Sequence, residues 1–244
     1  MLRCFIICLI SFSFFQSCEK GSIKPHVLKV KTGNINIKID YEIDNMPLEE
    51  MAMIYTTPNG YPFSVWKIQY IVSDFKFYNS SGVWKDSGFY FLDSQDTSKN
   101  LISIHGIPVG FYNGFSFLIG IKPENNIHNV LPATNDFQGM FWPEMMGGGY
   151  HFIKLEGRYS VGGVEKGYAM HIGENGFSIP ITMNKNFQIN NKIPTKDFQM
   201  IMNINEWFRN PVIYDFETDG ESIMGDSAAM RKIAKNGSDV FSIN

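Results

Sequence analysis

The chain has 244 residues, with 21 Lys and Arg, 24 Asp and Glu, and a formal net charge of −3. This balance, without a basic block, argues against electrostatic binding of nucleic acid, and 44% hydrophobic residues exclude a disordered chain. Aromatic residues make up 15% of the sequence, and 22 Gly and 11 Pro supply many turns, so the composition favours a strand-rich globular domain over a helical bundle.

The first residues have the pattern of a bacterial secretion signal. Arg3 precedes an apolar run over residues 4–15, which is too short to span a bilayer comfortably. Ser17 and Cys18 follow this run, and the pair resembles a lipoprotein processing site. A buried N-terminal strand or helix is the alternative interpretation of the same residues.

Processing at this site would define the mature chain. We expect residues 1–17 to be a signal peptide, Cys18 to carry the lipid, and residues 18–27 to form a tether. Cys4 and Cys8 would leave with the signal, so no thiol would remain for a disulfide, a metal site or a nucleophile. These features predict a lipoprotein of the bacterial cell envelope, anchored to the outer membrane and exposed to the periplasm or the cell surface.

Residues 28–244 are expected to form one β domain. Apolar and polar residues alternate over residues 35–41, which predicts a half-buried strand. A long strand follows over residues 64–78, and its apolar phase shifts near Ser73 and Asp74, as happens at a β-bulge. Further strands are expected at residues 89–92, 101–104, 115–121, 151–159, 167–172, 177–182 and 198–204.

Only the end of the chain has a clear helix pattern. Asp226 can cap a helix over residues 227–235, and Asn236 with Gly237 forms its stop signal. Short strands separated by frequent turns, followed by this helix, predict an all-β fold. We expect an antiparallel β-sandwich, immunoglobulin-like or barrel-like, with a short C-terminal helix.

Residues 140–151 are the densest segment of metal-ligating side chains. They combine three Met, one carboxylate and one imidazole beside a Gly-rich turn. Thioether and imidazole ligands suit copper, whereas hard cations prefer oxygen ligands. Core packing is the simpler explanation of the same Met and aromatic residues.

Two histidines have predicted positions on strands. His171 shares a strand face with Ala169 and Gly173, whose small side chains would let a ligand approach, and a hydrogen bond to a carbonyl is its alternative role. His151 shares a face with Ile153, which favours a packed histidine.

Motifs of hydrolytic enzymes are missing from the sequence. It contains no GxSxG nucleophile elbow, no HExxH pair and no phosphate-binding glycine loop. The 24 acidic residues have no spacing that selects a pair for glycoside hydrolysis. We therefore do not expect an enzyme.

Several stretches together resemble the MbnP-like family of secreted copper-binding proteins, which are linked to methanobactin and copper uptake. These stretches run in order through nearly the whole mature chain. They are residues 65–77, 107–112, 117–121, 140–142, 149–150, 154–157, 171–173 and 233–241.

The resemblance implies a β-sandwich-like domain that holds one copper ion. In the best-understood relatives a tryptophan is oxidised to kynurenine, and its new amine joins histidines around Cu(I). The resemblance also implies a dihaem partner of the cytochrome c peroxidase type that performs the oxidation. Carried over by position, Trp142 is the residue to be modified, and His171 matches the histidine of the family's His-x-Gly element.

One position departs from the pattern of some relatives. Where they have a further histidine two residues after the tryptophan, this chain has Glu144, whose oxygen is a harder ligand than Cu(I) prefers. His151, Met145 or Met146 could take its place.

We therefore expect an extracytoplasmic lipoprotein that binds a copper ion for acquisition, storage or delivery. The alternative is a metal-free module at the surface or in the periplasm that binds a glycan or a protein partner. Trp66, Trp84 and Trp207 could be its stacking platforms, although core packing is the expected role of most of them.

Overall fold

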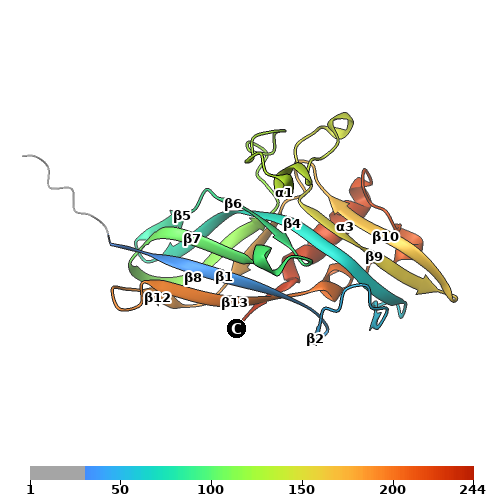
Figure 1. Cartoon of the computed structure of the whole chain (residues 1–244), viewed down its shortest axis with the longest axis horizontal. Helices are drawn as coiled ribbons and strands as arrows, with labels where there is room; N and C mark the ends of the chain where they lie inside the picture. Colours follow the sequence, from blue (N-terminus) through green and yellow to red (C-terminus); the bar gives the residue numbers. More distant parts are fainter. Residues whose placement is uncertain (1–30) are drawn as a thin grey trace, which may run out of the picture.

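Alternating apolar residues build two β-sheets over residues 31–244, the part of the chain that the computed structural model describes (Figure 1). The predicted signal peptide, Cys18 and the tether lie outside the described residues. The smaller sheet contains β1 (Thr32–Ile43), β2 (Met46–Pro47), β7 (Leu101–Pro108), β13 (Thr195–Asn203) and β14 (Phe241–Ile243). The larger sheet contains β3 (Tyr55–Thr56), β4 (Pro62–Asn79), β5 (Gly82–Lys85), β6 (Phe89–Asp93), β8 (Gly110–Ile119), β9 (Ile153–Val161), β10 (Val164–Ile172), β11 (Ile179–Met183) and β12 (Phe187–Ile189).

Strand β4 is the centre of the larger sheet, whose order is β10-β9-β4-β8-β11. The predicted bulge is confirmed, because the register between β4 and β8 shifts after Ser73 and Asp74 has a φ of 55°. Pro180 lies on the edge strand β11, as expected for a residue without a backbone N–H. The all-β sandwich is confirmed, with one parallel pair, β1 and β13, among otherwise antiparallel neighbours.

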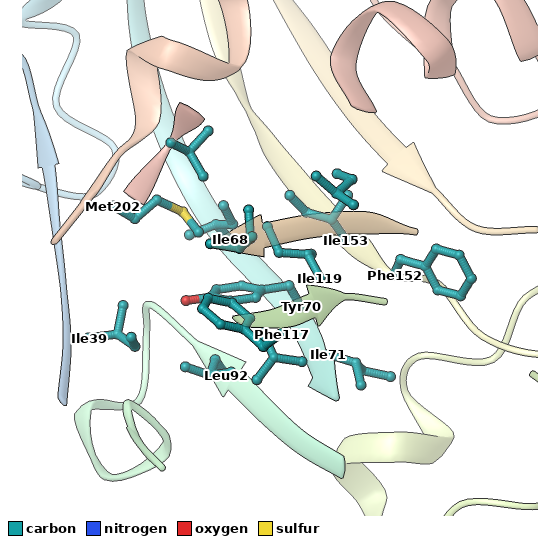
Figure 2. Close-up of a cluster of buried hydrophobic side chains, with 14 of the residues drawn as sticks. Ile39, Ile68, Tyr70, Ile71, Leu92, Phe117, Ile119, Phe152, Ile153 and Met202 are labelled. Atoms are coloured by element: carbon teal, nitrogen blue, oxygen red, sulfur yellow. The ribbon is translucent and has the colours of Figure 1, made fainter. Parts of the chain in front are cut away.

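Large apolar side chains fill the space between the sheets. Figure 2 shows Ile39 and Met202 of the smaller sheet facing Ile68, Tyr70 and Phe117 of the larger sheet. Aromatic pairs join the two sheets, with ring centroids 5.4 Å apart for Phe115–Phe198, 5.6 Å for Phe117–Phe241, 6.3 Å for Tyr70–Phe241 and 6.4 Å for Tyr41–Tyr70. Each fully buried ring contributes about 1.5–3 kcal/mol, so this layer is the main source of stability.

The predicted C-terminal helix is α3 (Ser227–Asn236). Asp226 caps it by accepting hydrogen bonds from the backbone N–H groups of residues 228 and 229. Gly237 ends the helix without a left-handed turn, because the chain continues directly into η4 (Gly237–Asp239). The remaining helical segments are short: η1 (Thr97–Lys99), α1 (Asn135–Gln138), η2 (Glu144–Met146), η3 (Ile204–Phe208) and α2 (Phe216–Asp219). Within the described residues, no helix is both long and apolar enough to cross a membrane.

Two glycines of the β9–β10 hairpin test how tightly this sheet is packed. A methyl group at Gly157 would lie 2.0 Å from the Ser64 carbonyl oxygen and 2.6 Å from the Tyr168 hydroxyl oxygen, whereas one at Gly167 would meet nothing closer than 3.9 Å. We expect Gly157→Ala to lower the free energy of unfolding by about 1–3 kcal/mol. Gly167→Ala should change it by less than about 0.5 kcal/mol. Urea unfolding measures both values, and equal effects would contradict this packing.

Candidate metal centre

A short antiparallel contact places Trp142 beside His151. The Trp142 N–H donates to the Gly149 carbonyl at 3.0 Å, and the His151 N–H donates to the Met140 carbonyl at 2.6 Å. The glycine-rich turn between these two segments lets the chain reverse, because Gly147, Gly148 and Gly149 all have positive φ angles. The two aromatic side chains are therefore fixed next to each other by backbone hydrogen bonds.

Strand pairing brings His171 to the same place. In the antiparallel ladder of β9 and β10, His171 lies opposite Lys154, next to the residues that precede β9. His171 shares its strand face with Ala169, as predicted, and the neighbouring Tyr168, Met170 and Ile172 are buried on the other face. The ladder thus places the His171 imidazole on the face of the sheet where a small neighbour, Ala169, leaves room for a ligand.

Trp142, His151 and His171 form a row of three rings, which we call the ring row. The ring centroids of Trp142 and His151 are 4.7 Å apart, and those of His151 and His171 are 5.2 Å apart with perpendicular planes. Trp142 is buried, His151 is 5% exposed, and the His171 side chain is 19% exposed. Gly173 leaves space for the indole, because a methyl group there would lie 2.3 Å from the Trp142 ring.

The middle ring of the row has a buried nitrogen without a hydrogen-bond partner. His151 Nδ1 lies 3.3 Å from the Met140 carbonyl oxygen, which can only accept, so Nδ1 carries the proton and Nε2 carries a free lone pair. Nε2 is buried and has no partner among the described residues. Burial, together with the positive charge of Lys154 and the nearby His171, lowers the pKa of His151 to about 3. The imidazole is therefore neutral and able to act as a ligand near neutral pH.

The outer ring of the row is held by a carboxylate. His171 Nε2 lies 2.9 Å from Oε1 of Glu156, and the Lys67 ammonium nitrogen lies 3.5 Å from the same oxygen. The hydrogen bond from His171 and the charge of Lys67 hold the pKa of Glu156 below its ordinary value, against the opposing effect of burial. Glu156 thus lies between a hydrogen-bond donor, His171, and a cation, Lys67.

The structure separates the predicted ligands into two groups. Trp142, His151 and His171 meet, whereas Glu144 is exposed at the start of η2 and Met145 is 93% exposed. Met146 contacts the row through its backbone, because its carbonyl accepts a hydrogen bond from Trp142 Nε1 at 3.2 Å. Within residues 31–244, no three His, Cys, Asp or Glu side chains gather into a metal-binding group.

His151 is packed, as predicted, but its predicted position on a strand is wrong. Strand β9 begins at Ile153, so the alternation does not extend back to His151, whose backbone pairs with Met140 instead. Its ring lies between those of Trp142 and His171.

The tryptophans predicted as stacking platforms differ in exposure. Trp207 is fully buried and Trp84 is partly buried against the core, as expected for most of these residues, so Trp207 is not a platform. Trp66 is 50% exposed and lines a cleft of about 490 Å³ together with Met51 and Glu156. Only Trp66 is thus placed as an aromatic platform beside a cavity.

Together, the two sheets and the ring row define an all-β protein with a buried indole beside two imidazoles. The chain belongs to the MbnP family, whose model matches residues 32–225, and the resemblance seen in the sequence motifs is confirmed. The solved structure of MbnP from Methylosinus trichosporium is similar with a TM-score of 0.60 and 15% identity, over 88% of this chain and 99% of that one. At this identity, the likeness shows a shared fold. No curated protein matches the chain.

Burial of neutral His151 predicts a pH-dependent stability. The folded-state pKa of about 3 lies below the ordinary value of 6.5, so the unfolded state binds more protons between these values, and stability falls as the pH falls. For the metal-free protein, we expect a loss of up to about 3 kcal/mol between about pH 7 and about pH 4 from this residue.

The variant His151→Asn isolates this contribution. It should lose that part of the pH dependence, whereas His105→Asn, which changes an exposed histidine on β7, should keep it. Urea unfolding at several pH values measures the slopes. Parallel slopes for wild type and His151→Asn would contradict a buried neutral imidazole.

Proposed function

We propose that this member of the MbnP family binds one copper ion at the ring row, for acquisition, storage or delivery. The observation that carries the proposal is the buried, unpartnered Nε2 of His151, a residue whose ring lies between those of Trp142 and His171. Burying a polar atom without a hydrogen bond costs free energy, and a bound cation would offset this cost.

The chemistry of the donors favours copper. Imidazole nitrogen suits copper, zinc and iron, but a closed structural zinc site uses four protein ligands. The described residues bring only two imidazoles together at the row, and the exposed Glu144 and Met145 add neither oxygen nor sulfur. Two neutral nitrogen donors in a largely buried position suit Cu(I), which accepts few ligands.

Trp142 would supply a third nitrogen after oxidation. Conversion of its indole to kynurenine opens the five-membered ring and leaves an aromatic amine next to His151, whose ring centroid is 4.7 Å from that of Trp142. We propose that a dihaem protein of the cytochrome c peroxidase type catalyses this oxidation, with two equivalents of hydrogen peroxide as the oxidant. The C2–C3 bond of the indole breaks as the peroxide is reduced, and hydrolysis of the resulting N-formyl group releases C2 as formate and frees the amine. We further propose that the protein reaches this partner in the cell envelope, tethered to the outer membrane through lipidated Cys18, and that it is not itself an enzyme.

Titration with Cu(I) in competition with a coloured chelator tests the proposal. Wild-type protein should bind one equivalent, and His151→Asn or His171→Asn should lower the affinity by about 100-fold or more, because each removes a ligand. His105→Asn is the matched control, because this exposed histidine on β7 should leave the affinity unchanged. Wild-type protein that does not bind Cu(I), or histidine variants that bind Cu(I) as tightly as wild type, would contradict the proposed copper site.

The oxidation of Trp142 is tested on protein from its native host. Mass spectrometry of the peptide that contains Trp142 should show the mass of kynurenine in copper-replete cells. Unmodified tryptophan in copper-loaded native protein would reject the oxidation step while leaving the two imidazole ligands in place.

A further inference from the structure

Glu156 occupies a position on the larger sheet from which it can reach His171. It lies directly opposite Ala169 on β10, so His171, two residues further along that strand, is its diagonal neighbour on the same face. Ala169, which faces Glu156 in the ladder, has only a methyl side chain. The Glu156 carboxylate meets His171 Nε2 at 2.9 Å.

Lys67 holds Glu156 from the opposite side. It is paired with Glu156 across β4 and β9, and its ammonium nitrogen lies 3.5 Å from Oε1 of Glu156. The same nitrogen lies 4.9 Å from the centroid of the Trp66 ring, so the ammonium group sits between a carboxylate and an aromatic face. The β4–β9 register shifts between Val65 and Lys67, which places Trp66 beside this pair instead of in the ladder.

The acceptor at each imidazole decides which of its nitrogens is free. An ionised carboxylate accepts but does not donate, so His171 Nε2 carries the proton toward Glu156, and in the neutral imidazole Nδ1 keeps the lone pair. At His151 the Met140 carbonyl acts in the same way on Nδ1 and leaves Nε2 free. Two fixed acceptors therefore set opposite tautomers on two neighbouring rings.

We propose that Glu156, held by Lys67, is a positioning residue that fixes the tautomer and orientation of His171. The geometry then assigns the two copper-binding nitrogens as Nδ1 of His171 and Nε2 of His151. This assignment of nitrogens rests on the proposed copper site, whereas the tautomer of His171 is a property of the metal-free protein. Carboxylates that orient ligand histidines in this way usually strengthen metal binding.

Nitrogen NMR of the full-length, metal-free protein tests the positioning role directly. The wild-type spectrum should show His171 protonated at Nε2, with a downfield, slowly exchanging Nε2 proton, and bare at Nδ1. In Glu156→Gln, the side-chain amide can donate as well as accept, so this signal should broaden or move upfield as both tautomers become populated. Glu165→Gln is the matched control, because it removes an exposed carboxylate from the same hairpin and should leave the His171 signals unchanged.

Cu(I) titration of the same three proteins separates the two proposals. If both hold, Glu156→Gln should weaken copper binding by about 10–100-fold, and Glu165→Gln should match wild type. A wild-type His171 protonated at Nδ1, or a spectrum unchanged in Glu156→Gln, would overturn the positioning role even if copper binds. Failure of wild type to bind Cu(I), with the expected tautomer present, would overturn the copper site and the nitrogen assignment but not the role of Glu156.

Discussion

The register of the β9–β10 hairpin is the constraint on which the candidate site depends. It places His171 opposite Lys154, three residues after His151, whose backbone N–H pairs with Met140. A shift of one residue would move His171 to the buried face of the sheet and separate the ring row. The turn that sets this register contains Gly162 and Gly163, and both have the positive φ angles that a tight two-residue hairpin requires.

The two faces of the same hairpin have different roles: one packs in the core, and the other lies beside the candidate site. One face of β9 and β10 carries buried residues such as Leu155 and Met170, which join the apolar core. The other face carries Lys154, Glu156 and His171, whose charges and hydrogen bonds surround the ring row. Because the core fixes the first face, the segment before β9 can keep His151 Nε2 unpaired at a tolerable cost in stability.

Much of the fold could be predicted from local patterns. The alternation in β1, the phase shift at Ser73–Asp74 and the Asp226 cap are short-range signals, and the structure confirms each of them. The parallel pairing of β1 with β13 depends on residues about 160 positions apart, which no local pattern encodes. Sequence reasoning could therefore identify strands but not how the smaller sheet is ordered.

The candidate site, too, could be predicted only in part. Family motifs identify Trp142 and His171. Strand alternation places His151 on β9, but this strand begins two residues after it, at Ile153. Glu156 and Lys67 were missed as residues of the site. The Gly162-Gly163 turn was a signal for Glu156, because a two-residue hairpin there pairs Val161 with Val164 and so places Glu156 diagonal to His171. The bulge that accompanies Lys67 has no comparable signal in the sequence.

Copper K-edge X-ray absorption of the Cu(I)-loaded protein tests the central claim most directly, because it reports which atoms surround the ion. The ring row predicts nitrogen scatterers with the multiple scattering of two imidazoles, and no sulfur. A sulfur shell would show that a methionine thioether, such as that of Met140, Met145 or Met146, binds the ion, and a spectrum without imidazole scattering would show that His151 and His171 do not bind it.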